Sequence, residues 1–203
     1  MLMNLRLIIL TTPDFLPQEA TALTAILDKG FRLHLRKPGC NEKELAALIE
    51  ELPASHRAGI VLHDHFTLQQ RYGLAGIHLN KRNPDIPSGY NGSISRSCHS
   101  LEEITEYKKQ TDYLFLSPIF NSISKQGYRS EFSMEQLRTA ARKGIIDTKI
   151  IALGGITADN LTTVRTLGFG GAALLGDVWN RYRSPDDTEA FLQHLDKLIQ
   201  TVS

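Results

Sequence analysis

The residues that decide the fold are 149–177, which read KIIALGGITADNLTTVRTLGFGGAALLGD. Two short apolar runs, at 149–153 and 170–175, flank a stretch at 160–167 whose apolar residues recur at helical spacing. Short apolar runs that alternate with helical stretches are typical of parallel strands joined by crossover helices. This segment therefore predicts one strand–helix–strand unit.

The same alternation extends over the whole chain. We expect further strands at residues 6–11, 32–36, 59–63, 76–79, 93–97 and 113–116, and further helices at 17–29, 41–51, 66–72, 101–110, 133–143 and 186–202. Strands that alternate with helices in this way form either a closed (β/α)8 barrel or an open doubly wound sheet. The strand count and the spacing of about 25 residues per unit favour a compact (β/α)8 TIM barrel. Because no linker or low-complexity run interrupts the pattern, we expect residues 1–203 to form a single domain.

Composition and charge exclude several classes of protein. The chain has 203 residues, with 23 Lys and Arg against 22 Asp and Glu, so its formal net charge is +1. This balance gives no broad electrostatic footprint for nucleic acid or an anionic membrane. Residues 1–10 are apolar but too few to span a bilayer, and they lack the features of a signal peptide. We therefore expect a cytoplasmic protein that binds neither nucleic acid nor membranes.

Histidines gather at one end of the expected barrel. His34, His63, His65, His78 and His99 all lie on or just after the second to fifth strands. Half-buried strands tolerate single histidines, but five at the carboxyl ends, where barrel enzymes do their chemistry, predict a polar cavity. The run His63-Asp64-His65 with His78 also suggests a metal site, although a third ligand at a fixed short spacing is missing.

The two cysteines, Cys40 and Cys98, are too few for a disulfide framework or a metal cluster. Cys98 and His99 are adjacent, so in a strand their side chains point to opposite faces and do not form a nucleophile pair. His99 shares its face with Ser97 and Ser95. We therefore expect His99 to transfer protons in the cavity and Cys98 to pack behind it.

Three segments near the end of the chain are suited to a phosphate group. Hydroxyls and an ammonium follow the sixth strand, two glycines follow the seventh, and a short turn follows the eighth. Loops after the seventh and eighth strands form a phosphate site in many barrels of this kind, because their backbone N–H groups are free. The expected phosphate ligands are Ser122, Ser124, Lys125, Gly154, Gly155, Leu175 and Gly176.

The order of these motifs resembles the thiamine phosphate synthase/TenI family over essentially the whole chain. The matching stretches are LHLRK at 33–37, GIHL at 76–79, SRSCHSLEE at 95–103, SPIFNSISK at 117–125 and ALGGI at 152–156. The resemblance implies a compact (β/α)8 barrel that acts on a thiazole phosphate. Synthases join this compound to an aminopyrimidine methyl diphosphate and release pyrophosphate, whereas TenI-like tautomerases move a proton on the thiazole.

Departures from the synthase pattern favour the tautomerase over the synthase. That pattern has Gln-Phe/Leu-Arg-Glu-Lys on the second strand, where this chain has His34-Leu35-Arg36-Lys37-Pro38. It has Asn-Asp after the third strand, here His63-Asp64, and its second metal carboxylate corresponds to Asn83. A single remaining carboxylate is a poor cage for Mg²⁺. Asp64 is therefore expected to bind metal only if the protein depends on Mg²⁺.

The resemblance thus implies a TenI-like thiazole tautomerase that needs no cofactor. His99 is its expected general acid/base, and His34 and Arg36 are expected to contact the substrate's carboxylate or ring. Asp177, an acid beside the phosphate, is expected to turn away and cap the next helix. The alternatives are a Mg²⁺-dependent synthase, a phosphate-binding barrel without activity, and a sugar-phosphate isomerase with Asp64 as base. A homo-oligomer is compatible with the apolar barrel helices.

Overall fold

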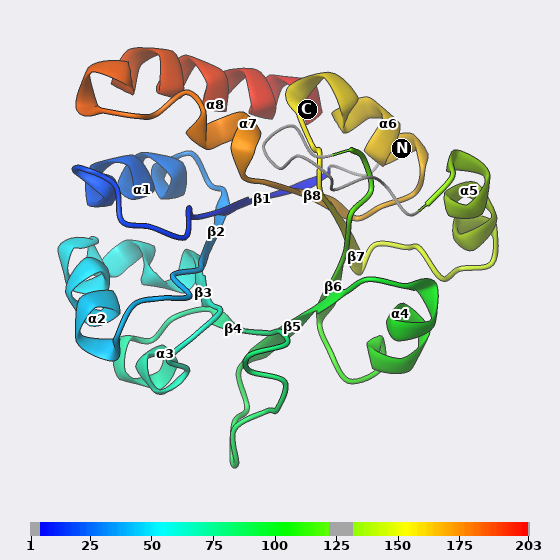
Figure 1. Cartoon of the computed structure of the whole chain (residues 1–203), viewed down its shortest axis with the longest axis horizontal. Coiled ribbons are helices and arrows are strands. Elements are labelled where there is room, and N and C mark those ends of the chain that lie inside the picture. The colour runs from blue at the N-terminus through cyan, green and yellow to red at the C-terminus, as the bar shows by residue number, and fades with distance from the viewer. Residues whose placement is uncertain (1–4, 122–131, 203) are drawn as a thin grey trace.

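Eight parallel strands close into a barrel in the computed structural model, which describes residues 5–121 and 132–202. Each strand pairs with the next one in the chain, and β8 pairs with β1 through registers such as Ile9 with Leu174. Figure 1 looks into this ring of strands. The closed order confirms the (β/α)8 barrel and excludes the open sheet. The strands are β1 (Arg6–Leu10), β2 (Arg32–Leu35), β3 (Ile60–Leu62), β4 (Gly76–Leu79), β5 (Ser93–Cys98), β6 (Tyr113–Leu116), β7 (Ile150–Leu153) and β8 (Gly171–Leu174).

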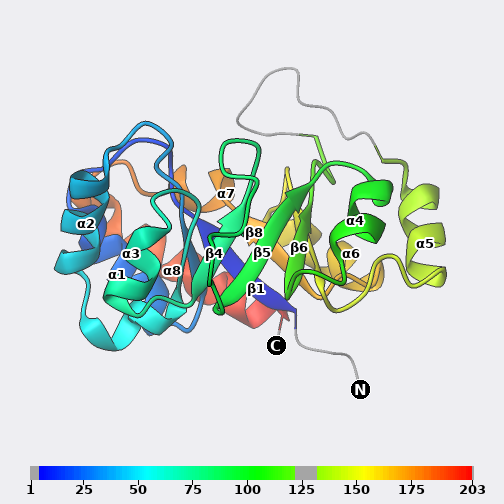
Figure 2. The same ribbon diagram turned by 90° about the horizontal axis from the view of Figure 1, so that it is seen from below.

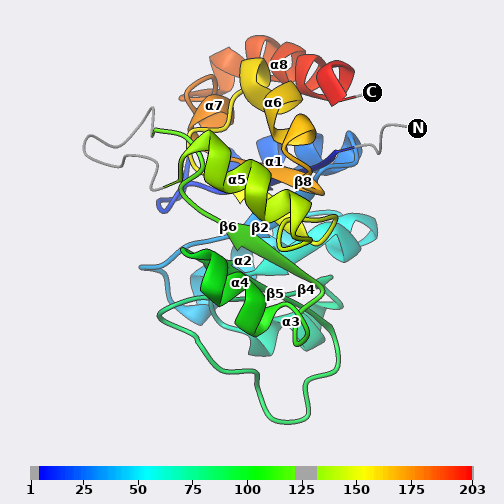
Figure 3. The ribbon, with the colours of Figure 1, turned by 90° about the vertical axis from the view of Figure 1, so that its right-hand side faces the viewer.

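Helices surround the strands on the outside of the ring (Figure 1). They are α1 (Glu19–Asp28), α2 (Glu42–Glu51), α3 (Thr67–Tyr72), α4 (Leu101–Tyr107), α5 (Met134–Arg142), α6 (Leu161–Thr166), α7 (Gly176–Trp179) and α8 (Thr188–Val202). Short 3₁₀ turns cover Ala54–Gly59, Ala158–Asn160 and Pro185–Asp187. Residues 80–92, which join β4 to β5, form no helix and extend away from the barrel wall (Figure 3). Among the described helices, none has the length and apolar character that a membrane crossing requires.

Local sequence signals account for where several helices begin. Asn41 accepts a hydrogen bond from the N–H of Glu44, whose side chain bonds back to Asn41, and the same capping box joins Ser133 to Gln136. Both helix starts agree with the sequence prediction. The helix expected at residues 17–29 begins later, at Glu19, because Gln18 adopts a left-handed conformation with φ of 51°.

The hydrophobic core has two parts, because strand residues alternate between the helices and the barrel axis. The larger part lies between strands and helices and includes the buried face of α8, formed by Phe191, Leu195 and Leu198. The smaller part fills one side of the barrel interior with Ile8, Leu10, Tyr113, Phe115, Ile151 and Ala173. The other side of the interior is polar and is formed by His34, His63, His78 and Ser95, all buried.

A buried ion pair fixes the end of β2 to α1. The Lys37 Nζ donates to both carboxylate oxygens of Glu19, at 2.6 and 2.8 Å, and to the carbonyl of Asp14 at 2.7 Å. Lys37 is 1% exposed and Glu19 is 3% exposed. Burial raises the pKa of Glu19 and lowers that of Lys37, while the bonds between them oppose both shifts. Each charge therefore depends on the other to remain ionised in the core.

The variant Lys37→Met is expected to lower the free energy of unfolding by about 3–5 kcal/mol, because it leaves the Glu19 carboxylate buried without a partner. The double variant Glu19→Leu/Lys37→Met should recover most of this loss in urea titrations. A matched control is Lys29→Met, which removes a partly exposed pair with Asp196 and should cost about 0–1 kcal/mol. Equal losses in the single and double variants would contradict this account.

Candidate active site at the carboxyl end of the barrel

The carboxyl ends of the strands all lie at one end of the barrel, which points upward in Figure 2. The parallel arrangement brings the residues after each strand to this common mouth. Arg36 follows β2, Asp64 follows β3, and His99 follows β5. Gly154 and Leu175 follow β7 and β8 on the opposite side of the ring. The mouth therefore collects the candidate residues from strands that are far apart in the sequence.

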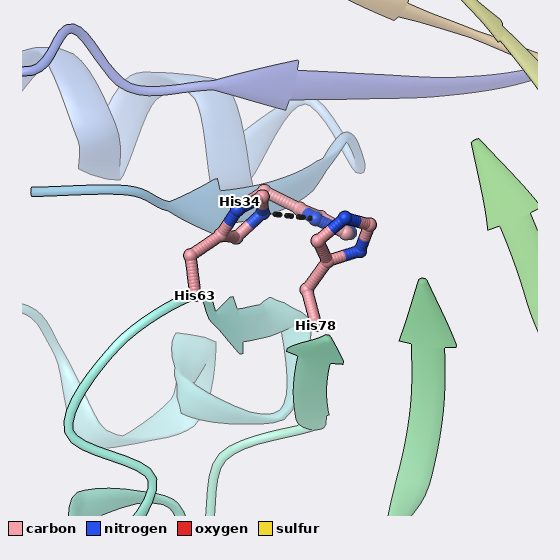
Figure 4. A group of neighbouring side chains, drawn as sticks. All are labelled: His34, His63 and His78. Carbon is pink, nitrogen blue, oxygen red and sulfur yellow. Dashed lines mark hydrogen bonds between the residues drawn. The ribbon is translucent and has the colours of Figure 1, made fainter. Parts of the chain in front are cut away.

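Three histidines lie together below the mouth, and Figure 4 shows the hydrogen bond between two of them, His34 and His63. The Nδ1 of His34 lies 2.9 Å from Nε2 of His63, and the Nε2 of His34 lies 2.7 Å from the Tyr113 hydroxyl. The two ring nitrogens of His78 lie 2.8 Å from the hydroxyls of Ser95 and Ser97. The predicted polar region thus exists, and its buried side chains are hydrogen-bonded to one another and to neighbouring hydroxyl groups.

These three rings are neutral at physiological pH. Burial lowers the pKa of His34 and of His63 well below the ordinary value of 6.5, and the neighbouring histidines lower both further. Burial first, and then the charge of Arg96, lowers the pKa of His78 to about 3. A neutral imidazole has one donor nitrogen and one acceptor nitrogen. In the bond between His34 and His63 one ring must therefore donate and the other accept, so the tautomer of one ring determines that of the other.

The histidine group is arranged for hydrogen bonding rather than for a metal ion. Nitrogens of His34, His63 and His78 lie within 4.8 Å of one another. However, both nitrogens of His34 and of His78 already have partners, and the rings of His63 and His78 stack at 4.1 Å instead of aiming at a common point. His63 and His65 would share a face only if the strand continued past His63, but β3 ends at Leu62. His65 adopts φ of 52° and bonds to the carbonyl of Cys40.

The structure separates His34 from Arg36, because β2 ends at Leu35 and Arg36 lies just beyond the strand. His34 is 0% exposed, and its ring bonds to His63 and Tyr113. The expectation that His34 contacts the substrate directly is therefore wrong, because the ring is enclosed in the core. The Arg36 side chain reaches the half-exposed mouth, and its guanidinium makes no hydrogen bond or ion pair to the described part of the chain.

Asp64, the expected magnesium ligand, is already paired. Its Oδ1 accepts hydrogen bonds from Arg82 Nη2 at 2.9 Å, Arg82 Nε at 3.1 Å and Asn83 Nδ2 at 3.0 Å. Its Oδ2 accepts from Arg82 Nη2 at 3.1 Å. Mg²⁺ requires open oxygen lone pairs in octahedral geometry. A carboxylate that holds a guanidinium and an amide does not supply them, so these residues do not fit the metal.

His99 lies at the rim of the mouth and is exposed. Its Nδ1 lies 3.1 Å from the carbonyl oxygen of Ser117, and its backbone N–H donates to Glu103 at 2.6 Å. Because a carbonyl only accepts, Nδ1 carries the proton of the neutral ring, and Nε2 is left without a partner among the described residues. Cys98 is 0% exposed, and burial raises its pKa to about 12, which agrees with its predicted place behind His99.

The glycines after β7 form a tight turn against the segment that follows β6. Gly154 and Gly155 have φ values of 95° and 62°, and their carbonyl groups accept from Phe120 and Asn160. Their N–H groups donate to no described residue, as a phosphate site requires. Leu175 and Gly176 lie beside this turn at the start of α7. Ser122, Ser124 and Lys125 lie outside the described residues.

Asp177 turns away from the mouth, as the sequence predicts. Its Oδ2 accepts from His194 Nε2 at 2.8 Å and from the N–H of Ala158 at 3.3 Å. Its Oδ1 accepts from Arg181 at 3.2 Å. The N–H group of Ala158 belongs to the first residue of the 3₁₀ turn before α6. The bond to His194 on α8 was not predicted from the sequence. These partners leave the acid 9% exposed and remove its charge from the phosphate region.

Comparison with known proteins identifies the family. The family model described as thiamine monophosphate synthase matches residues 7–178. The chain belongs to the thiamine monophosphate synthase family. A crystal structure of thiamine phosphate pyrophosphorylase from Bacteroides thetaiotaomicron is 41% identical, covers 97% of both chains and superposes with a TM-score of 0.88. The thiamine-phosphate synthase of Listeria welshimeri is 28% identical over 143 residues, which are 67% of this chain and 68% of that protein.

A more distant thiamine phosphate pyrophosphorylase, from Pyrococcus furiosus, is 21% identical with a TM-score of 0.76 and shares the fold. Membership of the thiamine monophosphate synthase family confirms the resemblance seen in the sequence. The sequence indicated that Lys81 and Arg82 could partly substitute for the missing metal, but it did not indicate an inward-facing Tyr113 or the bond from Arg82 to Asp64. Tyr113 faces inward with Phe115, which strand alternation could have indicated. The pairing of Arg82 with Asp64 joins two separate loops, and no local pattern signals it.

Proposed function

We propose that this protein is a thiamine-phosphate synthase, which joins an aminopyrimidine methyl diphosphate to a thiazole phosphate. One observation carries the proposal: the mouth has two separate regions suited to anions. Arg36 and Arg82 lie after β2 and β4, and the free N–H groups of Gly154 and Gly155 lie after β7 on the other side of the ring. Two anionic substrates need two such regions. Relatives that carry the synthase name support the same proposal.

The chemistry requires charge stabilisation more than proton transfer. The bond between the pyrimidine methylene carbon and the diphosphate oxygen breaks, and its electron pair leaves with pyrophosphate. The thiazole ring nitrogen then supplies an electron pair to the methylene carbon and forms the new carbon–nitrogen bond. The guanidinium groups of Arg36 and Arg82 would stabilise the leaving group's negative charge. The glycine turn, with Leu175, Gly176, Ser122, Ser124 and Lys125, would hold the thiazole phosphate.

A thiazole tautomerase is the second candidate, because the residues at Asp64 do not fit Mg²⁺ and His99 presents a free Nε2 at the rim. In that reaction a base removes a proton from one ring position and an acid returns a proton to another, so no bond to a leaving group breaks. His99 would carry the proton, and Arg36 would hold the substrate's carboxylate. This substrate carries its phosphate and its carboxylate on one molecule, so the reaction needs no region for a diphosphate.

Two reaction mixtures distinguish the candidates. The first contains the protein with thiazole phosphate and the aminopyrimidine diphosphate in the presence of MgCl₂, and the second contains the thiazole phosphate carboxylate tautomer alone. We expect release of pyrophosphate and formation of thiamine phosphate in the first mixture, measured by chromatography. The variant Arg36→Gln should lower this rate by about tenfold to a hundredfold, since a charged hydrogen bond to the leaving group is lost.

The control is Arg142→Gln on α5, where the arginine is exposed and pairs only with residues of its own helix. Aromatisation in the second mixture without pyrophosphate release in the first would replace the synthase by the tautomerase. A variant His99→Ala with full tautomerase activity would then remove the role given to His99. Phosphate binding without either reaction would leave a barrel that only binds its ligand.

A further inference from the structure

The loop after β4 is built to hold one arginine over Asp64. Backbone bonds between Asn80 and Asn83 run in both directions, at 3.0 and 3.1 Å. The side chain of Asn80 donates to the carbonyl of His63 at 2.8 Å and accepts from the N–H of Arg82 at 3.0 Å. The turn is therefore closed by its own bonds and fixed to the end of β3. This places the Arg82 guanidinium on the carboxylate of Asp64 before any ligand arrives.

Asn83 presents nitrogen, not oxygen, to this site. Its Nδ2 donates to the carbonyl of His63 at 3.0 Å and to Asp64 Oδ1 at 3.0 Å. Both partners only accept, so the amide cannot be turned around without losing both bonds. A divalent cation at this position would face the N–H group of Asn83 instead of an oxygen ligand, and the positive charge of Arg82 would repel it. The residues thus exclude a cation by geometry and by charge.

The same residues leave positive charge available at the mouth. The Arg82 side chain is 41% exposed, and its Nη1 makes no hydrogen bond to a described residue. Asp64 forms its ion pair with Arg82, and the Arg36 guanidinium forms no ion pair with a described residue. Leu35 and Leu62 are paired in the register of β2 and β3, so Arg36 and the Asp64–Arg82 pair follow the ends of adjacent strands. In agreement, burial and then the charge of Arg82 lower the pKa of Arg36, while the charge of Asp64 raises it. Two guanidinium groups beside one carboxylate favour an anion with several oxygens.

We propose that Arg82 and Arg36 bind the diphosphate group directly and take the place of a divalent cation at Asp64. The choice of a diphosphate as ligand rests on the proposed synthase function. Asp64 then acts as a positioning residue, because it orients the Arg82 guanidinium and leaves Nη1 directed at the ligand. The planar guanidinium can present two parallel N–H groups to phosphate oxygens, which a single ammonium cannot.

Calorimetric titration of the full chain with inorganic pyrophosphate tests this inference. We expect dissociation constants that agree within about threefold in excess EDTA and in MgCl₂, because no metal contributes to binding. The variant Arg82→Gln should weaken binding by about tenfold or more in EDTA, the loss of one charged hydrogen-bonded contact. Arg142→Gln, which removes an exposed arginine elsewhere, should bind pyrophosphate as the unchanged protein does.

The variant Asp64→Asn distinguishes a metal site from an arginine site by the direction of its effect. Removal of the negative charge beside the anion should leave pyrophosphate binding unchanged or tighter, since the asparagine oxygen can still accept from Arg82. A magnesium site would instead lose its only carboxylate and its affinity. The inference is overturned if MgCl₂ tightens binding about tenfold and Asp64→Asn abolishes that gain, or if pyrophosphate fails to bind under both conditions.

Turnover measured in the same buffers separates this inference from the proposed function. Synthase activity that EDTA abolishes would leave the function standing and refute the arginine site. Pyrophosphate binding in EDTA that depends on Arg82, without any synthase turnover, would leave the anion site standing and refute the function. Manganese binding followed by electron paramagnetic resonance gives a further readout, and we expect no manganese bound at Asp64.

Discussion

Gly155→Ala is expected to weaken binding of the thiazole phosphate by about a hundredfold or more, or ~2.7 kcal/mol. Gly155 has φ of 62°, and an added Cβ would lie 2.4 Å from the carbonyl oxygen of Asn121 and 2.9 Å from the carbonyl carbon of Phe120. These are backbone atoms, which cannot rotate away as a side chain could. Either the glycine turn or the segment after β6 must move, and both line the proposed phosphate region.

The measurement is calorimetric titration with thiazole phosphate, with circular dichroism to verify that the variant remains folded. Gly144→Ala is a matched control, because Gly144 has a similar φ of 70° but no atom within 4 Å of the added Cβ. Gly144→Ala should lose about 1 kcal/mol of stability, because alanine is strained at this φ. It should bind thiazole phosphate as the unchanged protein does. Wild-type affinity in Gly155→Ala would show that the turn takes no part in binding.

Mild acid is expected to unfold this protein because of the three neutral histidines in the barrel. Their pKa values lie below the ordinary value of 6.5 in the folded state, about 3 for His78, so the unfolded chain binds more protons as the pH falls. Stability is undiminished above about pH 6.5 and is lost as the pH drops toward the folded pKa values. Between pH 7 and pH 5 His78 alone should cost about 2 kcal/mol, and His34 and His63 should act in the same direction.

The loss from His78 alone is already a substantial part of the free energy of unfolding of an ordinary domain, about 5–15 kcal/mol. Urea titrations at several pH values measure it directly. His78→Gln removes one of the three titrating rings and should reduce the slope by about 1.4 kcal/mol per pH unit between pH 6 and pH 4. A stability that does not change between pH 7 and pH 5 would refute the claim that these rings are held neutral.

Local patterns were sufficient for the fold. Alternation of apolar runs with helical stretches predicted eight strands, and two of them, β4 and β6, begin and end where expected. The helix start at Asn41 was predictable, because the capping box lies within four residues. The early end of β3 was not, since the left-handed conformation of His65 depends on its bond to Cys40, which lies 25 residues away in sequence.

The depth of a residue along the barrel was harder to infer than its face. Alternation predicts that His34 and Arg36 point to the same side of β2, yet one lies in the core and the other at the mouth. The sequence indicates neither how far a strand extends nor which loop covers it. Likewise, the composition of residues 80–83 gives no sign that Arg82 bonds to Asp64, because the two belong to different loops.

The bond between His34 and His63 also bears on how this chain diverged from its relatives. The synthase pattern has glutamine at the position of His34 and asparagine at that of His63, so two departures in separate strands are in direct contact. Exchange of one residue alone would change the length of one side chain and the position of its polar atoms in this buried contact. We expect the two positions to co-vary among family members, so that sequences carry both histidines or neither. Two apparently separate departures in the sequence would then count as one evolutionary event.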